Sequence, residues 1–200
     1  MRLLNANEVM IRSLEDACGL TAYKITLTLR DLNVATDVEY QKNYTSYYRV
    51  RRDEAWLIKY YSFMETYKND NTLNFETILR YLSNIPHKVK VSRVNPSGYA
   101  TTVEASFASK MLATINPDFP IWDSQVVAAL GYDVVPTLRG EDKIRAYVEA
   151  YANLKKEVDD FIHTSDGVAC LSLFDAQFPR YAYINPVKKI DYFLWNIGKP

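Results

Sequence analysis

Residues 106–126 read SFASKMLATINPDFPIWDSQV, and this stretch decides the fold that the sequence predicts. Its first half belongs to a run, 104–115, whose apolar residues recur at helical spacing: Phe107, Ala108, Met111, Leu112 and Ile115. Asn116-Pro117 ends that run, and Asp123 begins a shorter one that stops at Gly131, as aspartate N-caps and glycine C-caps do. A brief proline-framed connection between two helices predicts that they fold back on each other in an all-α protein.

Helical periodicity continues on both sides of this stretch. We expect helices over 54–67, 73–82, 141–162, 168–178 and 187–197, with Asn71 or Thr72 as the cap of the second. Most of the eight prolines stand at the junctions, so the sequence predicts seven to nine helices and few hairpins. The exception is 21–29, TAYKITLTL, whose alternating residues favour a short strand.

The composition limits the class of protein. With 200 residues, 48% of them hydrophobic, the chain buries a core as one domain, and lobes of 1–96 and 97–200 with a cleft between them are a further expectation. Two distant cysteines provide neither a disulfide framework nor zinc ligands, which favours a reducing, cytoplasmic compartment. No signal-peptide core or membrane span is recognisable, so we expect a soluble protein without a membrane partner.

Common catalytic motifs are absent from the sequence. Two isolated histidines, and no GxGxxG or GxxxxGK[ST], argue against a metal site, a Ser-His-Asp triad or a nucleotide fold, and we expect no cofactor. What remains is Lys110 inside an apolar helix and Asp123 at the head of the next. An amine among apolar groups can attack an electrophilic carbon and form a Schiff base, and a carboxylate at a helix N-terminus can stabilise an adjacent cation.

The run SFASKMLATINPDFPIWDSQV resembles the core of the helix-hairpin-helix DNA glycosylase superfamily, in particular small bacterial proteins similar to 8-oxoguanine DNA glycosylase. Residues 188–195, KKIDYFLW, also resemble the closing helix of the small members, so the likeness covers about 100–200. The resemblance implies a base-excision repair glycosylase and lyase that binds double-stranded DNA with a damaged base. It implies Lys110 as the nucleophile on the sugar and Asp123 as the catalytic carboxylate.

The formal net charge is zero, so any DNA binding must come from a local basic patch. Residues 21–110 hold 13 basic and 9 acidic residues, whereas 111–165 hold 5 and 9. The residues we expect to contact nucleic acid are Arg49, Arg51, Arg52, Lys88, Lys90 and Arg93, with Trp122 lining a base pocket.

Each of these residues also has a structural interpretation. Lys110 fits a solvated lysine lying over apolar neighbours, Asp123 fits a plain N-cap, and Trp122 fits a residue that staples a helix entry. The segment before Lys110, 103–109, also lacks the glycines of the superfamily's L-P-G-x-G hairpin and holds one acid. These features favour a non-catalytic helical module for protein or nucleic-acid contact, and a lysine-dependent enzyme on a small carbonyl substrate is a third alternative.

Overall fold

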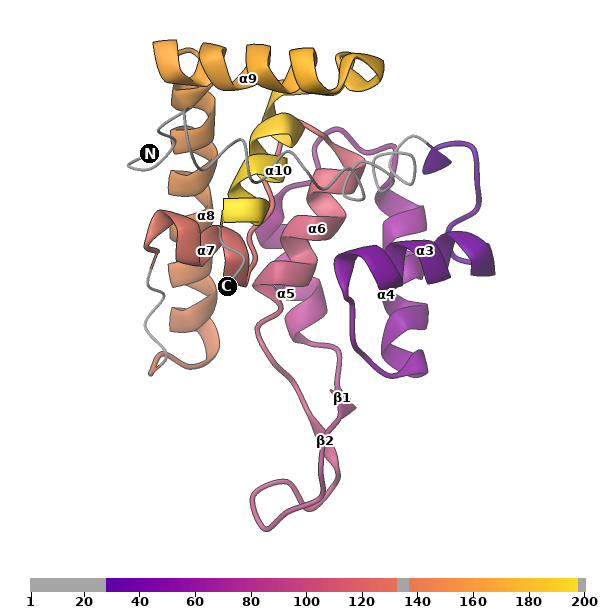
Figure 1. Cartoon of the computed structure of the whole chain (residues 1–200). Helices are drawn as coiled ribbons and strands as arrows, with labels where there is room; N and C mark the ends of the chain where they lie inside the picture. The colour runs from indigo at the N-terminus through magenta and orange to yellow at the C-terminus, as the bar shows by residue number, and fades with distance from the viewer. Residues whose placement is uncertain (1–27, 133–136, 198–200) are drawn as a thin grey trace. The chain divides into compact units, whose positions relative to one another are not determined.

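The computed structural model describes residues 28–132 and 137–197, and most of them are helical (Figure 1). The all-α prediction is therefore confirmed. The α-helices are α3 (Val38–Tyr48), α4 (Glu54–Tyr67), α5 (Phe75–Ser83), α6 (Ala105–Ile115), α7 (Ser124–Leu130), α8 (Gly140–Phe161), α9 (Ser165–Gln177) and α10 (Pro186–Ile197). A 3-10 turn, η2 (Pro179–Tyr181), and two short strands, β1 (His87–Lys88) and β2 (Tyr99–Ala100), complete the described elements.

The contacts divide the chain into two compact units, one of residues 22–115 and one that contains 116–200. The division falls between Ile115 and Asn116, whereas the sequence suggested lobes that meet after residue 96. It separates the two helices of the deciding stretch, because α6 ends the first unit and α7 begins the second. Each unit is described by itself below.

In the 22–115 unit, α5 packs against α6, and aromatic side chains of α3 and α4 fill the rest of the core. Tyr44, Trp56 and Tyr60 are completely buried there. Side chains at the N-termini hold the helices: Asp37 accepts from the Tyr40 amide, and Asp53 from the Trp56 amide. These caps satisfy donors that have no partner inside the helix, so they fix where each helix begins.

In the 116–200 unit, α10 packs against α7, α8 and α9. Phe174, Ile190 and Phe193 are fully buried at these contacts, and Leu154 and Val158 carry the inner side of α8. The helix expected over 141–162 is thus α8, and its buried residues, Tyr151, Leu154, Val158 and Phe161, lie at helical spacing on the side that lines the core.

The helices match the sequence prediction closely, with four differences. Asn74 caps α5 in place of Asn71 or Thr72, because Asn74 directly precedes the helix and its side chain reaches the Thr77 amide. Helix α3 was not predicted, and the β1–β2 hairpin was missed. The strand expected over 21–29 lies mostly outside the described residues. Of its last two residues, Thr28 is helical and Leu29 lies in a turn.

Candidate functional site

Lys110 lies on α6 and is only 8% exposed. Its Nζ donates a hydrogen bond to the carbonyl oxygen of Tyr48, 3.2 Å away, and lies 5.9 Å from the centre of the Phe107 ring. Most of α6 is buried, from Ala108 to Ile115, so the aliphatic stem of the lysine is enclosed with the helix. The interpretation of Lys110 as a solvated lysine is therefore wrong.

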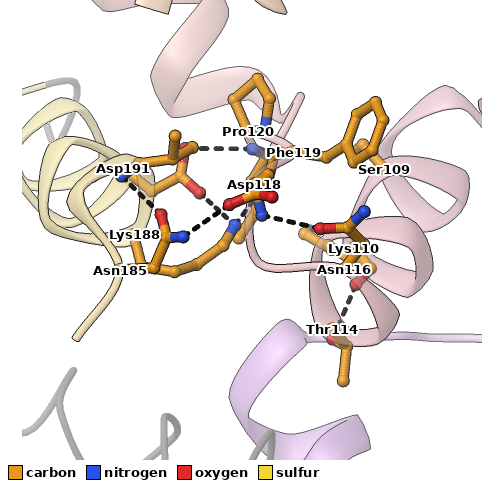
Figure 2. A network of polar contacts seen from close by, with 12 residues as sticks. Ser109, Lys110, Thr114, Asn116, Asp118, Phe119, Pro120, Asn185, Lys188 and Asp191 are labelled. Carbon is orange, nitrogen blue, oxygen red and sulfur yellow. Dashed lines mark hydrogen bonds and ion pairs between the residues drawn. The ribbon is translucent and has the colours of Figure 1, made fainter. Parts of the chain in front are cut away.

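Tyr48 connects the last turn of α3 to this part of α6. Its carbonyl accepts from Lys110, and its hydroxyl accepts from Thr114 at 3.4 Å. Thr114 also donates to the Lys110 carbonyl at 2.7 Å, within the same helix (Figure 2). Because Tyr48 of α3 binds both the Lys110 amine and the Thr114 hydroxyl of α6, the position of the amine depends on α3.

Behind Tyr48 lies a cluster of buried tyrosines on α3 and α4. The Tyr44 and Tyr60 hydroxyls are 2.9 Å apart, and Tyr60 donates to the Phe107 carbonyl of α6 at 3.1 Å. Burial raises the pKa of both phenols well above the ordinary value, so they stay protonated. The hydroxyl hydrogen bonds of this cluster therefore link α3 to α4, and α4 to the helix that holds Lys110.

Arg52 is bound inside the unit at the entry to α6. Its Nη2 and Nε lie 2.5 and 3.0 Å from Oε1 of Glu104, and its guanidinium carbon lies 4.9 Å from the centre of the Phe107 ring. Glu104 is 7% exposed and also accepts from the Thr102 hydroxyl. Glu104, the acid just before α6, thus forms an internal ion pair. Sequence reasoning missed this pair, although Glu104 is the only acid in 77–117.

The other predicted phosphate ligands are exposed. Arg49 ends α3 with a left-handed backbone, φ 52°, and Arg51 follows it in an extended segment. Lys88, Lys90 and Arg93 lie on the β1–β2 hairpin. Of the six predicted basic contacts, Arg52 alone is engaged with a nearly buried carboxylate.

Asp123 is the N-cap of α7, as predicted. Its Oδ1 accepts from the amides of Gln125 and Val126 at 3.0 and 3.1 Å, and the residue is 8% exposed. Gly131 closes the helix at φ 69°. The two backbone donors orient this carboxylate at the positive end of the helix dipole, which suits an anion.

Trp122 is 5% exposed and packs its ring edge to face with the aromatic residues that follow in the same unit. The ring centres of Tyr132 and Tyr147 lie 5.3 and 6.1 Å from its own. These contacts support the interpretation of Trp122 as a packed residue at a helix entry more than as the wall of an open base pocket.

The loop that leads to Asp123 is held by α10 through a polar network (Figure 2). Lys188 donates to the Phe119 carbonyl at 2.6 Å and forms an ion pair with Asp191 at 2.7 Å. Asp191 accepts from the Ile121 amide at 3.0 Å, and Asn185 donates to Asp118 at 2.6 Å. These bonds fix the loop without any repetitive backbone structure.

Two further features complete the network. Tyr151 of α8 donates to the Pro120 carbonyl at 2.8 Å. Burial raises the pKa of the Asp191 carboxyl above its ordinary value, although Lys188 and the Ile121 amide act in the opposite direction, and Asp123 adds to the rise. Sequence reasoning missed Lys188 and Asp191 as a pair, but their three-residue spacing on the closing helix is a signal that was available.

Lys110 and Asp123 fall in different units, 22–115 and 116–200. Among the described residues, no group of three or more His, Cys, Asp or Glu side chains could hold a metal ion, and no helix is long and apolar enough to cross a membrane. Comparisons with protein-family models, with curated proteins and with solved structures give no match.

Proposed function

We propose that this protein is a base-excision repair glycosylase and lyase that acts on a damaged base in double-stranded DNA. The observation that carries the proposal is the setting of Lys110, whose amine is nearly enclosed on α6, beside an aromatic ring and 3.2 Å from a neutral carbonyl. A lysine amine whose direction is fixed by one backbone carbonyl can bond to a sugar carbon and form a Schiff base once it has lost its proton. The oriented carboxylate of Asp123 supplies the second group of the resemblance.

The chemistry uses the two side chains in sequence. The damaged nucleotide is flipped out of the duplex, the bond between the base and C1′ breaks, and the base leaves with the bonding electrons. The Asp123 carboxylate stabilises the positive charge that develops on the sugar. The Lys110 amine then bonds to C1′. The C1′–O4′ bond breaks, one amine proton passes to O4′, and an iminium forms at C1′. Loss of a C2′ proton from this iminium expels the 3′ phosphate.

Borohydride trapping tests the proposal. The protein is incubated with duplexes that contain an abasic site or 8-oxoguanine, in the presence of borohydride, which delivers hydride to the iminium and leaves a stable secondary amine. We expect a covalent protein–DNA adduct with the wild-type chain and none with Lys110→Gln. Wild-type protein that binds the duplex and gives no adduct would refute the nucleophile.

The matched control is Lys68→Gln. Lys68 belongs to the same unit, is 7% exposed, and donates to a backbone carbonyl, that of Leu32, at 2.5 Å. Burial and carbonyl bonding are alike in the two lysines, and Lys68 in addition forms an ion pair with Glu65 at 2.9 Å. A loss of adduct that follows from unfolding alone would therefore occur in both variants. Circular dichroism melting of each variant shows whether it is folded.

A non-catalytic nucleic-acid-binding module is the second candidate. It is favoured by the ion pair of Arg52 with Glu104 at the entry to α6, where the superfamily resemblance implies glycine amides that grip a phosphate. On this reading the Lys110–Tyr48 bond is structural. Duplex binding without an adduct selects this candidate. If the protein gives neither duplex binding nor an adduct, a lysine-dependent enzyme on a small carbonyl substrate is favoured instead.

A further inference from the structure

Residues 86–100 form an extension of the 22–115 unit that we call the hairpin arm. The antiparallel strands β1 and β2 pair His87 with Ala100 and Lys88 with Tyr99. The segment between them, 89–98, reaches away from the helices of its own unit (Figure 1). The arm was not expected from the sequence.

Backbone hydrogen bonds order the far end of the arm. The Val89 amide donates to the Gly98 carbonyl at 2.9 Å, and the amides of Ser92 and Gly98 both donate to the Asn95 carbonyl at 3.2 Å. Gly98 has φ +70°, and a Cβ placed there would lie 3.1 Å from a methyl group of Val91. The end of the arm is therefore a defined turn that depends on glycine.

The base of the arm is fixed to the helices. Asp53, the N-cap of α4, uses its other oxygen to accept from the Lys88 amide at 2.8 Å. That bond is the largest of the influences that lower the pKa of Asp53 below its ordinary value. His87 is 7% exposed, so the first residue of β1 is packed against its unit. Because its base is fixed to the helices, the arm projects from the unit in a defined direction.

The surface of the arm combines apolar and basic side chains. Val94 is 86% exposed and Val91 is 67% exposed, the largest fractions among the exposed large hydrophobic residues of the described chain. Lys88, Lys90 and Arg93 are exposed beside them. No acidic residue occurs between Glu76 and Glu104, so the arm carries three positive charges and no negative one. Two exposed valines beside three cations give the arm a surface that is both apolar and basic.

We infer that the hairpin arm is a DNA-binding arm that enters the major groove of a duplex. Its three cations contact phosphates, and Val91 and Val94 contact the base edges. The major groove, about 12 Å wide, admits a two-stranded β-ribbon, and apolar side chains there contact thymine methyl groups. Arginine and lysine on phosphates supply the salt-dependent part of such binding. The choice of DNA as the nucleic acid rests on the proposed function.

The chemistry of the arm favours a duplex over an anionic membrane surface. Segments that bind membranes from the surface are typically amphipathic helices that bury Trp, Phe or Leu. The arm is a hairpin whose far end, 89–98, contains no aromatic residue and exposes Val91 and Val94. The exposed aromatic residue of the arm, Tyr99, is 50% exposed and lies at its base, in β2. Positive charge spread along a narrow ribbon matches the phosphate rims of a groove.

Binding to an undamaged duplex tests the arm without any chemistry. The arm variant combines Lys88→Gln, Lys90→Gln and Arg93→Gln, and the control variant combines Arg30→Gln, Lys42→Gln and Lys59→Gln, three exposed cations of the same unit. With loss of three phosphate contacts, we expect at least about tenfold weaker binding at low salt and a slope of log affinity against log salt smaller by about 2 to 3. The control should lose less on both measures.

A second pair of variants tests the valines. Val94→Ser should weaken binding several-fold and leave the salt slope unchanged, because no charge is lost. Replacing thymine by uracil in the duplex should reduce the effect of Val94→Ser, since the methyl groups are gone. Val38→Ser, at an exposed valine outside the arm (60% exposed), should change neither measure.

The outcomes separate the arm from the proposed function. An adduct at Lys110 together with unchanged binding by the arm variant overturns the arm and leaves the glycosylase. Arm-dependent duplex binding without an adduct supports the arm and overturns the nucleophile. Arm-dependent binding to phosphatidylserine vesicles with no duplex binding overturns the DNA assignment. The major-groove placement is overturned if a minor-groove ligand displaces the protein from the duplex and methyl green, a major-groove ligand, does not.

Discussion

Asp123 carries two roles that a single substitution to alanine would confuse. Its side chain caps α7 through two backbone amides, and its charge is the group that the proposed chemistry uses. Asparagine caps helices about as well as aspartate and lacks the charge, so it separates the two roles.

We predict that Asp123→Ala lowers the free energy of unfolding by about 1 kcal/mol, because the Gln125 and Val126 amides lose their acceptor. Asp123→Asn should stay within about 0.5 kcal/mol of the wild type and yet lose most of the borohydride adduct. Urea unfolding and adduct yield, measured on the same preparations, check both statements. An Asn variant with full adduct yield would show that the charge is not required.

At the scale of elements, the close approach of α8 and α9 depends on one glycine. Gly167 lies in the first turn of α9, and a Cβ there would meet the Phe161 carbonyl oxygen at 1.9 Å and its carbon at 2.8 Å. Phe161 is the last residue of α8, so the obstacle is backbone and cannot rotate away.

Helix propensity alone would make Gly167→Ala stabilising by about 1 kcal/mol. We predict instead a loss of about 1 to 3 kcal/mol, because the connection between the helices must open to admit the methyl group. The control is Gly131→Ala, where a Cβ meets nothing within 4 Å and only the left-handed backbone, φ +69°, costs stability. Thermal melting of both variants decides, and a neutral or stabilising Gly167→Ala would refute the close approach.

The same scale shows what the sequence could and could not predict. The helix α4 begins and ends at the predicted residues, because its apolar spacing is strong and Asp53 caps it. Helix α3 was not predicted because its buried residues are tyrosines, at positions 40, 44 and 48. Their four-residue spacing is helical, but tyrosine is also common on protein surfaces. The hairpin arm was not predicted because its valines are exposed, so the sequence shows no alternation of buried and exposed residues that would indicate a strand.

The candidate site shows the same limit at longer range. The N-cap role of Asp123 is local and was predicted from the short apolar run that follows it and stops at Gly131. The ion pair of Arg52 with Glu104 and the hold of α10 on the loop before Asp123 join residues 52 and 70 positions apart, respectively. No periodicity within one element encodes such contacts, and they became visible only with the fold.

At the scale of the whole molecule, the net charge of zero conceals an uneven distribution. Residues 22–115 hold 13 basic and 9 acidic residues, and residues 116–200 hold 9 basic and 12 acidic. Along α8 the exposed cations Arg145 and Lys156 are each paired with an aspartate one turn away. The positive field that a duplex would meet therefore belongs to the 22–115 unit.

Hydrogen exchange of the full chain with an undamaged duplex tests this distribution. We predict that added duplex slows exchange at low salt in peptides that cover 49–51 and 88–98, where exposed positive charge meets phosphate, and leaves peptides within 140–161 unchanged. The protection should vanish at high salt, because the contacts release counterions when they form. Greater protection over 140–161 than over 88–98 would mean that the acidic side of the chain binds DNA, and the charge argument would then be wrong.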